Sequence, residues 1–192
     1  MRYTLPAMSS ASHVAVKRLT ADNEAEFYRI HNETTGNGWC QCVAWWTPSW
    51  DGWSERTAQE NEALRRRLLS EGVHDGYLIF SDGALAGWCQ AWRRDAFAKL
   101  ATQFGATSDN DAWMIGCVLI LPNYRGQGVA GEALAQIVGD LRLRGARSVD
   151  AYPKRGASEP GELWNGPEST YLRLGFAVVR DDTKRPVLRL TF

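Results

Sequence analysis

The chain of 192 residues lacks any run of about 18 apolar residues, so we do not expect a transmembrane helix. It also lacks net charge, because 22 acidic residues balance 22 basic ones. Broad electrostatic attraction to nucleic acid or to an anionic membrane is therefore not expected. The first residues lack the apolar segment of a secretory signal peptide, and residues 1–12 are expected to form a flexible tail. With four cysteines and no secretion signal, we expect a cytoplasmic setting.

The sequence also lacks a recognisable metal-binding pattern. Its cysteines are separated by two, 47 and 28 residues, which fits no common zinc site: Cys40, Cys42, Cys89 and Cys117. The three histidines form no HxxxH pair. Cys40-x-Cys42 is not the CxxC of a redox pair, although oxidation of an exposed thiol there stays open. We therefore expect no metal, and we expect Cys89 and Cys117 to act as small hydrophobic residues in apolar strands.

The pattern of apolar residues that is present predicts a mixed α/β fold. Apolar residues make up 44% of the chain, enough for a core, and residues 13–192 are expected to form a single domain. Strands are expected at 14–19, 76–80, 84–94, 112–122, 146–153, 176–182 and 186–192. Helices are expected at 21–33, 54–72, 95–104, 126–144 and 168–175.

A glycine-rich turn between a buried strand and the strongest helix carries the clearest functional signal. The strand ends at Pro122, and Gly126, Gly128 and Gly131 open the helix. Free backbone N–H groups and the positive end of the helix dipole meet at such a turn, and glycine lets a phosphate approach the backbone. The segment therefore predicts a phosphate or pyrophosphate site, with a plain strand-to-helix turn as the alternative.

The same letters also satisfy a dinucleotide-binding pattern. Gly126-x-Gly128-x-x-Gly131 is followed by Asp150 about 20 residues further on. Against this interpretation, residues 122–125 separate the strand from the first glycine. The chain after Gly131 is also too short for the second half of a doubly wound sheet. A small dinucleotide-binding module stays open as an alternative.

Two motifs resemble the GNAT superfamily of acyl-CoA-dependent N-acyltransferases. The segment from Pro122 to Ala130, Pro-Asn-Tyr-Arg-Gly-Gln-Gly-Val-Ala, resembles its acetyl-CoA loop, and Tyr171-Leu-Arg-Leu-Gly-Phe176 resembles its late helix. The Cys-x-Cys and the Gly-Ala-x-x-Val-x-x-Tyr-Pro segment at 145–153 are similar to a poorly characterised subgroup. The resemblance covers residues 14–192 in element order, and its specific motifs lie within 113–178.

The resemblance implies a fold, a cosubstrate and a binding surface. The fold would be a central mixed, mostly antiparallel sheet flanked by helices on both faces. The cosubstrate would be acetyl-CoA. Backbone groups of Val118, Leu119 and Ile120 would bind its pantetheine arm, and an amide near Val118 would polarise the thioester carbonyl. The pyrophosphate would lie on the turn and first helical residues: Arg125, Gly126, Gln127, Gly128, Val129, Ala130 and Gly131.

The resemblance also implies catalytic roles. Tyr171 would protonate the departing CoA thiolate, with plain packing on a short helix as the alternative. A base must take the proton of the attacking amine. Asp150 is the candidate, because it shares a strand face with Ser148 and Tyr152; a carboxylate that is solvated or paired in an ion bridge is the alternative.

A run of tryptophans and cysteines precedes the second predicted helix. In the family's layout this region borders the acceptor site, so we expect these residues to line a substrate pocket: Trp39, Cys40, Cys42, Trp45, Trp46 and Tyr152. The rings could equally fill the core or form a dimer interface, so a homodimer stays open.

The sequence as a whole predicts an acetyl-CoA-dependent N-acetyltransferase. The acetyl group would pass to a primary amine by direct attack in a ternary complex. The neutral charge and the aromatic loop favour a small molecule over a protein as the acceptor. A CoA-binding sensor or catalytically inactive acyltransferase fold is the main alternative.

Overall fold

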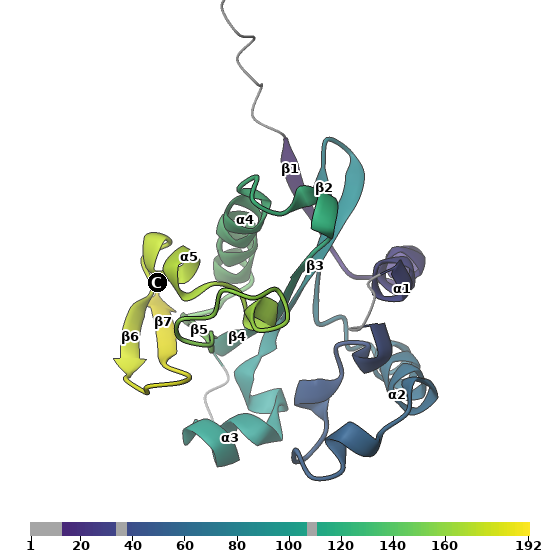
Figure 1. Cartoon of the computed structure of the whole chain (residues 1–192), viewed down its shortest axis with the longest axis horizontal. Helices are drawn as coiled ribbons and strands as arrows, with labels where there is room; N and C mark the ends of the chain where they lie inside the picture. The colour runs from purple at the N-terminus through teal and green to yellow at the C-terminus, as the bar shows by residue number, and fades with distance from the viewer. Residues whose placement is uncertain (1–12, 34–37, 107–110) are drawn as a thin grey trace, which may run out of the picture.

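A seven-stranded sheet forms the centre of the computed structural model, which describes residues 13–33, 38–106 and 111–192. The strand order is β1-β2-β3-β4-β5-β7-β6 (Figure 1). The strands are β1 (Val14–Arg18), β2 (Gly76–Ser81), β3 (Ala84–Arg93), β4 (Ala112–Ile120), β5 (Ser148–Ala151), β6 (Ala177–Arg180) and β7 (Val187–Thr191). All neighbouring strands are antiparallel except β4 and β5, which are parallel. The mixed, mostly antiparallel sheet is therefore confirmed, and the predicted tail at 1–12 lies outside the described residues.

The helices are α1 (Glu24–Glu33), α2 (Ala58–Ser70), α3 (Ala98–Phe104), α4 (Val129–Leu143) and α5 (Glu168–Arg173). Short 3-10 turns lie between them, including Gly38–Cys40, Ala44–Trp46, Trp53–Glu55 and Leu163–Asn165. Thr57 caps α2 and accepts a hydrogen bond from the Glu60 amide, as expected for a Thr-x-x-Glu capping box. None of the described helices is long and apolar enough to cross a membrane.

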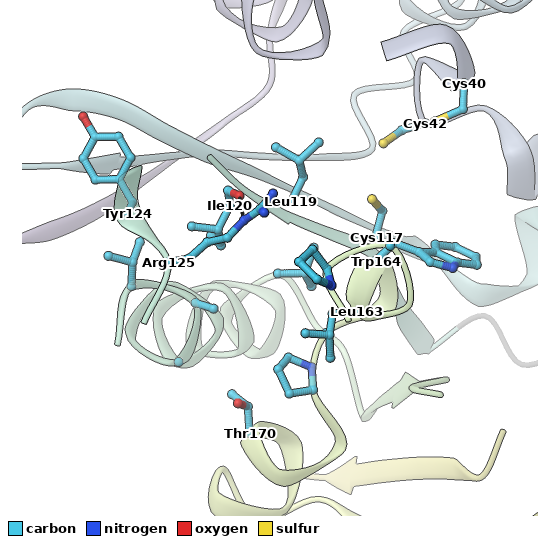
Figure 2. Close-up of a pocket in the computed structure, with 18 of the residues that line it drawn as sticks. Cys40, Cys42, Cys117, Leu119, Ile120, Tyr124, Arg125, Leu163, Trp164 and Thr170 are labelled. Atoms are coloured by element: carbon cyan, nitrogen blue, oxygen red, sulfur yellow. Dashed lines mark hydrogen bonds between the residues drawn. The ribbon is translucent and has the colours of Figure 1, made fainter. Parts of the chain in front are cut away.

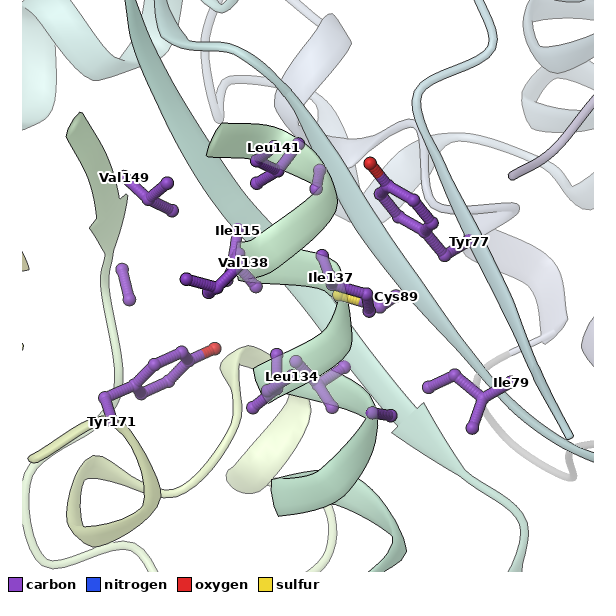
Figure 3. Packing of buried hydrophobic residues seen from close by; sticks show 14 of the residues in the cluster. Tyr77, Ile79, Cys89, Ile115, Leu134, Ile137, Val138, Leu141, Val149 and Tyr171 are labelled. Atoms are coloured by element: carbon purple, nitrogen blue, oxygen red, sulfur yellow. The ribbon is translucent and has the colours of Figure 1, made fainter. Parts of the chain in front are cut away.

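Helices cover both faces of the sheet, because apolar side chains of the central strands point to both faces. Tyr77 and Ile79 point to one face, where they pack with Leu134, Ile137 and other apolar residues of α4 (Figure 3). Leu78, the residue between them, points to the other face and packs with Phe27 of α1. Because successive strand residues face opposite sides, each strand in the centre is apolar on both faces.

The hairpin of β2 and β3 forms at the predicted turn. Asp82 and Gly83 link the strands with φ of 49° and 80°. Both positions need the left-handed conformation that Asp and Gly tolerate, which is typical of two-residue hairpin loops.

Candidate functional site

The parallel strands β4 and β5 separate partway along the sheet. They pair only from Ala112 with Ser148 to Ile115 with Ala151, while β4 continues to Ile120 along β3. Residues 116–120 therefore have β3 on one edge and no β5 on the other. An opening between two central strands exposes backbone groups to whatever binds there.

A cavity of about 650 Å³ lies at this opening. Figure 2 shows Tyr124 and Arg125 at one end and Cys40, Cys42 and Trp164 toward the other. The first end is built by the end of β4, the glycine turn, α4 and α5: Val118, Leu119, Ile120, Tyr124, Arg125, Gly126, Gly128, Val129, Ala130, Gly131, Thr170 and Arg173. The second end is the part around Cys40, Cys42, Cys117 and Trp164. The other lining residues are His31, Trp39, Ala44, Trp50, Trp53, Pro160, Gly161, Leu163, Gly166 and Pro167.

The glycine turn has the geometry of an anion site. Gly126 and Gly128 have φ of 73° and 83°, and a Cβ at either position would point into open space. Gly128 is the N-cap residue of α4, a helix of 15 residues whose first amides face the cavity end. Arg125 and Arg173 add positive charge there. Free amides, a helix dipole and two guanidinium groups suit a pyrophosphate.

The structure brings together most of the residues predicted to bind the cosubstrate. Val118 to Ile120, Arg125, Gly126 and the residues from Gly128 to Gly131 line the cavity. Gln127 differs, because its side chain donates to the Asn123 carbonyl at 2.7 Å and it does not line the cavity.

A bulge at Gly116 fastens two loops to β4. The register of β3 and β4 shifts between Gln90 and Ala91, where Gly116 is skipped. Its carbonyl accepts hydrogen bonds from Trp45 Nε1 at 3.0 Å and from Asn165 Nδ2 at 2.7 Å. A Cβ at Gly116 would lie 2.7 Å from Gln90 Oε1, so only glycine fits without a shift. The loops on both sides of the cavity are thereby held to one strand.

His31 and three thiols form a polar group in the second end of the cavity. His31 is buried at the end of α1, and its Nδ1 lies 2.9 Å from the Phe27 carbonyl oxygen. A carbonyl only accepts, so Nδ1 carries the proton and Nε2 has the free lone pair. Nε2 lies 3.2 Å from Cys42 Sγ, so the thiol of Cys42 donates to it. Burial lowers the pKa of His31 to about 4, and the ring is therefore neutral near pH 7.

The three thiols lie against one another. The sulfur atoms of Cys42 and Cys117 point toward each other in Figure 2. The hydrogen bond to Cys117 and burial raise the pKa of Cys42, and the hydrogen bond to Cys42 and burial raise the pKa of Cys40. Both thiols are therefore protonated near neutral pH. Within residues 13–33, 38–106 and 111–192, no group of three or more His, Cys, Asp or Glu side chains is placed to hold a metal ion.

A buried ion pair holds the backbone of this thiol segment. Gln41 and Cys42 have φ of 46° and 49°, an unfavourable conformation for residues other than glycine. Arg65 of α2 donates to the Gln41 carbonyl at 3.1 Å and to the Cys42 carbonyl at 3.0 Å. The same guanidinium binds Asp75 at 2.6 Å, and both side chains are fully buried. Arg65 thus offsets the backbone strain that turns Cys42 toward the cavity.

The predicted substrate-pocket residues fall into two groups. Trp39, Cys40 and Cys42 line the cavity, and their contact with the substrate stays a prediction. Three others do not line it: Trp45 is 2% exposed and donates to the Gly116 carbonyl, Trp46 Nε1 donates to Asp75 Oδ2 at 2.8 Å, and Tyr152 is buried against Phe104. These three side chains pack in the core beside the cavity, because their polar atoms find partners there.

Sequence reasoning missed several cavity residues. Trp50 and Trp53 line the cavity and belong to the same aromatic run as Trp39, so membership of this run could have identified them. Trp164 also lines the cavity, but it lies in a loop far along the chain and outside the run. His31 and Cys117 gave no local signal. His31 reaches the cavity beside Cys42 near the end of α1, and Cys117 reaches it because it lies on β4 beyond the last residue paired with β5.

Asp150 lies in a buried ion cluster. Its carboxylate accepts from Arg94 Nη1 at 2.6 Å and from Arg189 Nε at 2.6 Å and Nη2 at 2.9 Å. It is 1% exposed and does not line the cavity. Its role as the base stays a prediction that this geometry does not favour, because both carboxylate oxygens are bonded to guanidinium groups and the side chain does not reach the cavity.

Tyr171 is also buried and lies behind the cavity wall. Its hydroxyl donates to the Asn165 carbonyl at 2.7 Å. Gly166 lines the cavity, and a Cβ at this position would lie 2.8 Å from the Tyr171 hydroxyl. Gly166 therefore lies between Tyr171 and the cavity. Burial raises the pKa of Tyr171, and its role as the acid stays a prediction.

Comparison with solved structures identifies the fold. PaiA N-acetyltransferase from Thermoplasma acidophilum, in complex with coenzyme A, has 13% identity and a TM-score of 0.55, covering 94% of this chain and 99% of that one. A GNAT family acetyltransferase from Brucella melitensis, in complex with acetyl-CoA, has 15% identity and a TM-score of 0.52, covering 94% and 88%. Aminoglycoside acetyltransferase AAC(6')-Ib, in complex with coenzyme A, has 16% identity and a TM-score of 0.60, covering 93% and 95%. At these identities the likeness establishes the fold alone.

A sequence search of curated proteins finds no significant match. A family model does match: the model described as the acetyltransferase (GNAT) family covers residues 39–157, well over half of the chain. This span contains β4, the glycine turn and α4, the elements that build the first end of the cavity. Because the glycine turn belongs to the matched acetyltransferase span, the small dinucleotide-binding module is no longer needed as an explanation of the turn. The chain therefore belongs to the GNAT acetyltransferase family, and it is an acetyltransferase that uses acetyl-CoA as its cosubstrate.

Proposed function

We propose that this enzyme transfers the acetyl group of acetyl-CoA to the amino group of a small primary amine, by direct attack in a ternary complex. One observation carries the proposal: a single cavity joins the anion site at α4 to an aromatic and thiol-lined end. Its volume of about 650 Å³ lies within the range typical of small-molecule sites. Two reactants could therefore meet inside it.

The chain's own backbone would bind and orient the cosubstrate. Amides of the glycine turn and the start of α4 would hold the pyrophosphate, and the open edge of Val118 to Ile120 would bind the pantetheine arm. An amide near Val118 would donate to the thioester oxygen as negative charge develops on it. The acetyl group would then lie next to Cys117, where the second end of the cavity begins.

The proton of the attacking amine needs an acceptor inside the cavity. No carboxylate lines the cavity among the residues that the structure describes. The unprotonated imidazole nitrogen there is His31 Nε2, which accepts the hydrogen bond of the Cys42 thiol. We therefore assign the amine's proton to Cys42 Sγ, as the thiol proton passes to His31 Nε2. The imidazolium of His31 would afterwards return the proton through Cys42 to the departing CoA thiolate, so the transfer needs no net proton from solvent.

Tyr171 is the other proposed donor to the thiolate. Its hydroxyl must leave the Asn165 carbonyl to reach the cavity, and Gly166 lies between them. Replacing Tyr171 by Phe tests this role: a fall in kcat at unchanged acetyl-CoA affinity supports it. Unchanged turnover of this variant between pH 6 and 9 would mean that His31, and not Tyr171, supplies the proton to the CoA thiolate.

Release of free thiol from acetyl-CoA in the presence of primary amines tests the function as a whole. We expect amine-dependent thiol release and an N-acetylated product by mass spectrometry. Calorimetry with acetyl-CoA provides the control for binding. Tight acetyl-CoA binding without thiol release for any small amine would contradict the proposal.

A further inference from the structure

A buried ammonium group occupies the aromatic wall of the cavity. Lys99 of α3 is 2% exposed, and its Nζ lies 3.6 Å from the ring centroid of Trp50 and 5.4 Å from that of Trp53. The ammonium also donates to the Ala44 carbonyl. Trp50, Trp53 and Ala44 all line the cavity, whereas Lys99 does not. The protein therefore supplies its own cation to the rings that could have bound a cationic substrate.

The charge of Lys99 is not neutralised by a neighbouring carboxylate. Within the described part of the chain, Lys99 forms no ion pair, and the charged side chain that acts on its pKa is another cation, Arg56. Burial lowers the pKa of Lys99 to about 8, with a smaller contribution from Arg56. Below that pH the side chain is mostly protonated, and the two indole rings and one carbonyl stabilise it.

The part of the cavity surface formed by described residues adds no compensating negative charge. The charged side chains among these lining residues are Arg125 and Arg173 at the pyrophosphate end, and His31 is neutral. A cation bound to Trp50 or Trp53 must lie within about 6 Å of a ring centroid. It would then be at most about 11 Å from the Lys99 ammonium, and because Trp50 is partly exposed the effective dielectric constant is about 20. Two positive charges at that separation disfavour binding about ten-fold.

We propose that the acceptor is a monoamine with an uncharged apolar or aromatic body, and that Lys99 excludes amines that carry a second positive charge. The inference rests on the proposed acetyltransferase function and specifies its substrate class. Apolar groups gain from burial against Trp39, Trp50, Trp53 and Trp164. The positive charge of Lys99 also favours the neutral form of the acceptor's single amino group, which is the form that attacks the thioester.

A matched pair of amines tests this inference. Hexylamine and 1,6-diaminohexane have the same chain, and they differ in whether the far end is a methyl group or an ammonium group. We expect kcat/KM for hexylamine to exceed that for 1,6-diaminohexane about ten-fold or more at pH 7. The aromatic monoamine 2-phenylethylamine should be accepted as well as hexylamine or better.

Variants of Lys99 connect the discrimination to this residue. Lys99→Gln keeps a donor for the Ala44 carbonyl and removes the charge, so the ratio of the two kcat/KM values should fall several-fold. Lys99→Arg keeps the charge and should keep the ratio. Because each ratio is measured on one protein preparation, a change in the folded fraction cancels. Raising the pH from 7 to 9 should also lower the ratio in the wild type, because Lys99, on which Arg56 is the other acting charge, loses its proton.

The outcomes separate the inference from the function on which it rests. Thiol release with hexylamine together with equal or faster turnover of 1,6-diaminohexane would overturn the inference and leave the acetyltransferase function intact. An unchanged ratio in Lys99→Gln would overturn the role of Lys99. Absence of thiol release with all three amines, despite acetyl-CoA binding, would overturn the proposed function and this inference with it.

Discussion

The Nε2 atom of His31 lies 3.2 Å from Cys42 Sγ, in the wall of the cavity where acetyl-CoA and the acceptor are proposed to meet. The two residues come from α1 and from the Cys-x-Cys segment, and a third group, the Phe27 carbonyl, orients the imidazole. A nucleophile-like side chain, a base and an orienting acceptor form an arrangement that enzymes use for proton transfer. Here the raised pKa of Cys42 keeps the thiol protonated, so a relay fits better than a thiolate nucleophile.

Substitution of Cys42 tests the relay. Cys42→Ala should lower kcat about 100-fold, while Cys42→Ser, which keeps a proton donor toward His31, should retain most of the turnover. The measurement is steady-state thiol release at saturating acetyl-CoA and hexylamine. Cys89→Ala is the matched control, since Cys89 is buried in β3 and does not line the cavity. Equal kcat values for Cys42→Ala and the control would remove the relay from the mechanism.

A substitution in the glycine turn should separate binding from folding. Gly128→Val forces a β-branched residue to φ 83° and fills space proposed for the pyrophosphate. We expect at least a 100-fold loss of acetyl-CoA affinity by calorimetry, with destabilisation of about 1–2 kcal/mol.

Gly139→Ala in the same helix is the matched control. Gly139 has open space at its Cβ position, so alanine should leave affinity unchanged and raise the free energy of unfolding by up to about 1 kcal/mol. Retained affinity in Gly128→Val would show that the pyrophosphate lies elsewhere.

The buried pair of Arg65 and Asp75 should be among the costliest polar contacts to break. Asp75→Asn leaves the guanidinium of Arg65 buried without an opposing charge, and it weakens the bonds that hold Gln41 and Cys42 at positive φ. We expect a loss of about 3–5 kcal/mol in the free energy of unfolding by denaturant titration.

A neighbouring surface pair provides the comparison. Arg66 and Glu62 form an exposed pair one residue along the same helix. Glu62→Gln should therefore change stability by less than about 0.5 kcal/mol. A similar small effect of Asp75→Asn would mean that the Cys-x-Cys segment is held in place by packing alone.

Acidification should lower the free energy of unfolding, because His31 is buried as the neutral imidazole. Its pKa is about 4 in the folded protein and 6.5 in the ordinary unfolded environment, so the unfolded chain binds more protons between these pH values. The free energy of unfolding should therefore fall as the pH decreases from 6.5 to 4, with a contribution from His31 of about 3 kcal/mol.

The difference between wild type and His31→Gln isolates this effect, because carboxylates that titrate in the same range are common to both proteins. Asp75 and Arg65, the charged groups nearest His31, are also unchanged. Parallel stability curves for the two proteins between pH 6.5 and 4 would show that His31 titrates normally in the fold.

The glycine turn in the first end of the cavity could be predicted from the sequence alone. A strand, a proline, two glycines at fixed spacing and a helix form a continuous segment, and the positive φ of Gly126 and Gly128 is a local property of the turn. Strand alternation and helical periodicity likewise predicted the elements, since burial against a sheet imposes these periods on the chain.

Only the tertiary structure decided the second end. The directions of Trp45 and Trp46 depend on the Gly116 carbonyl and on Asp75, which lie far along the chain, and no periodicity in an irregular loop records such partners. Asp150 could be placed on a strand face from its sequence, but Arg94 and Arg189 reach it from other elements and occupy its carboxylate. His31 and Lys99 carried no motif at all. Their roles arise because the fold buries one imidazole beside a thiol and one ammonium beside two indole rings, and burial is what changes the chemistry of both groups.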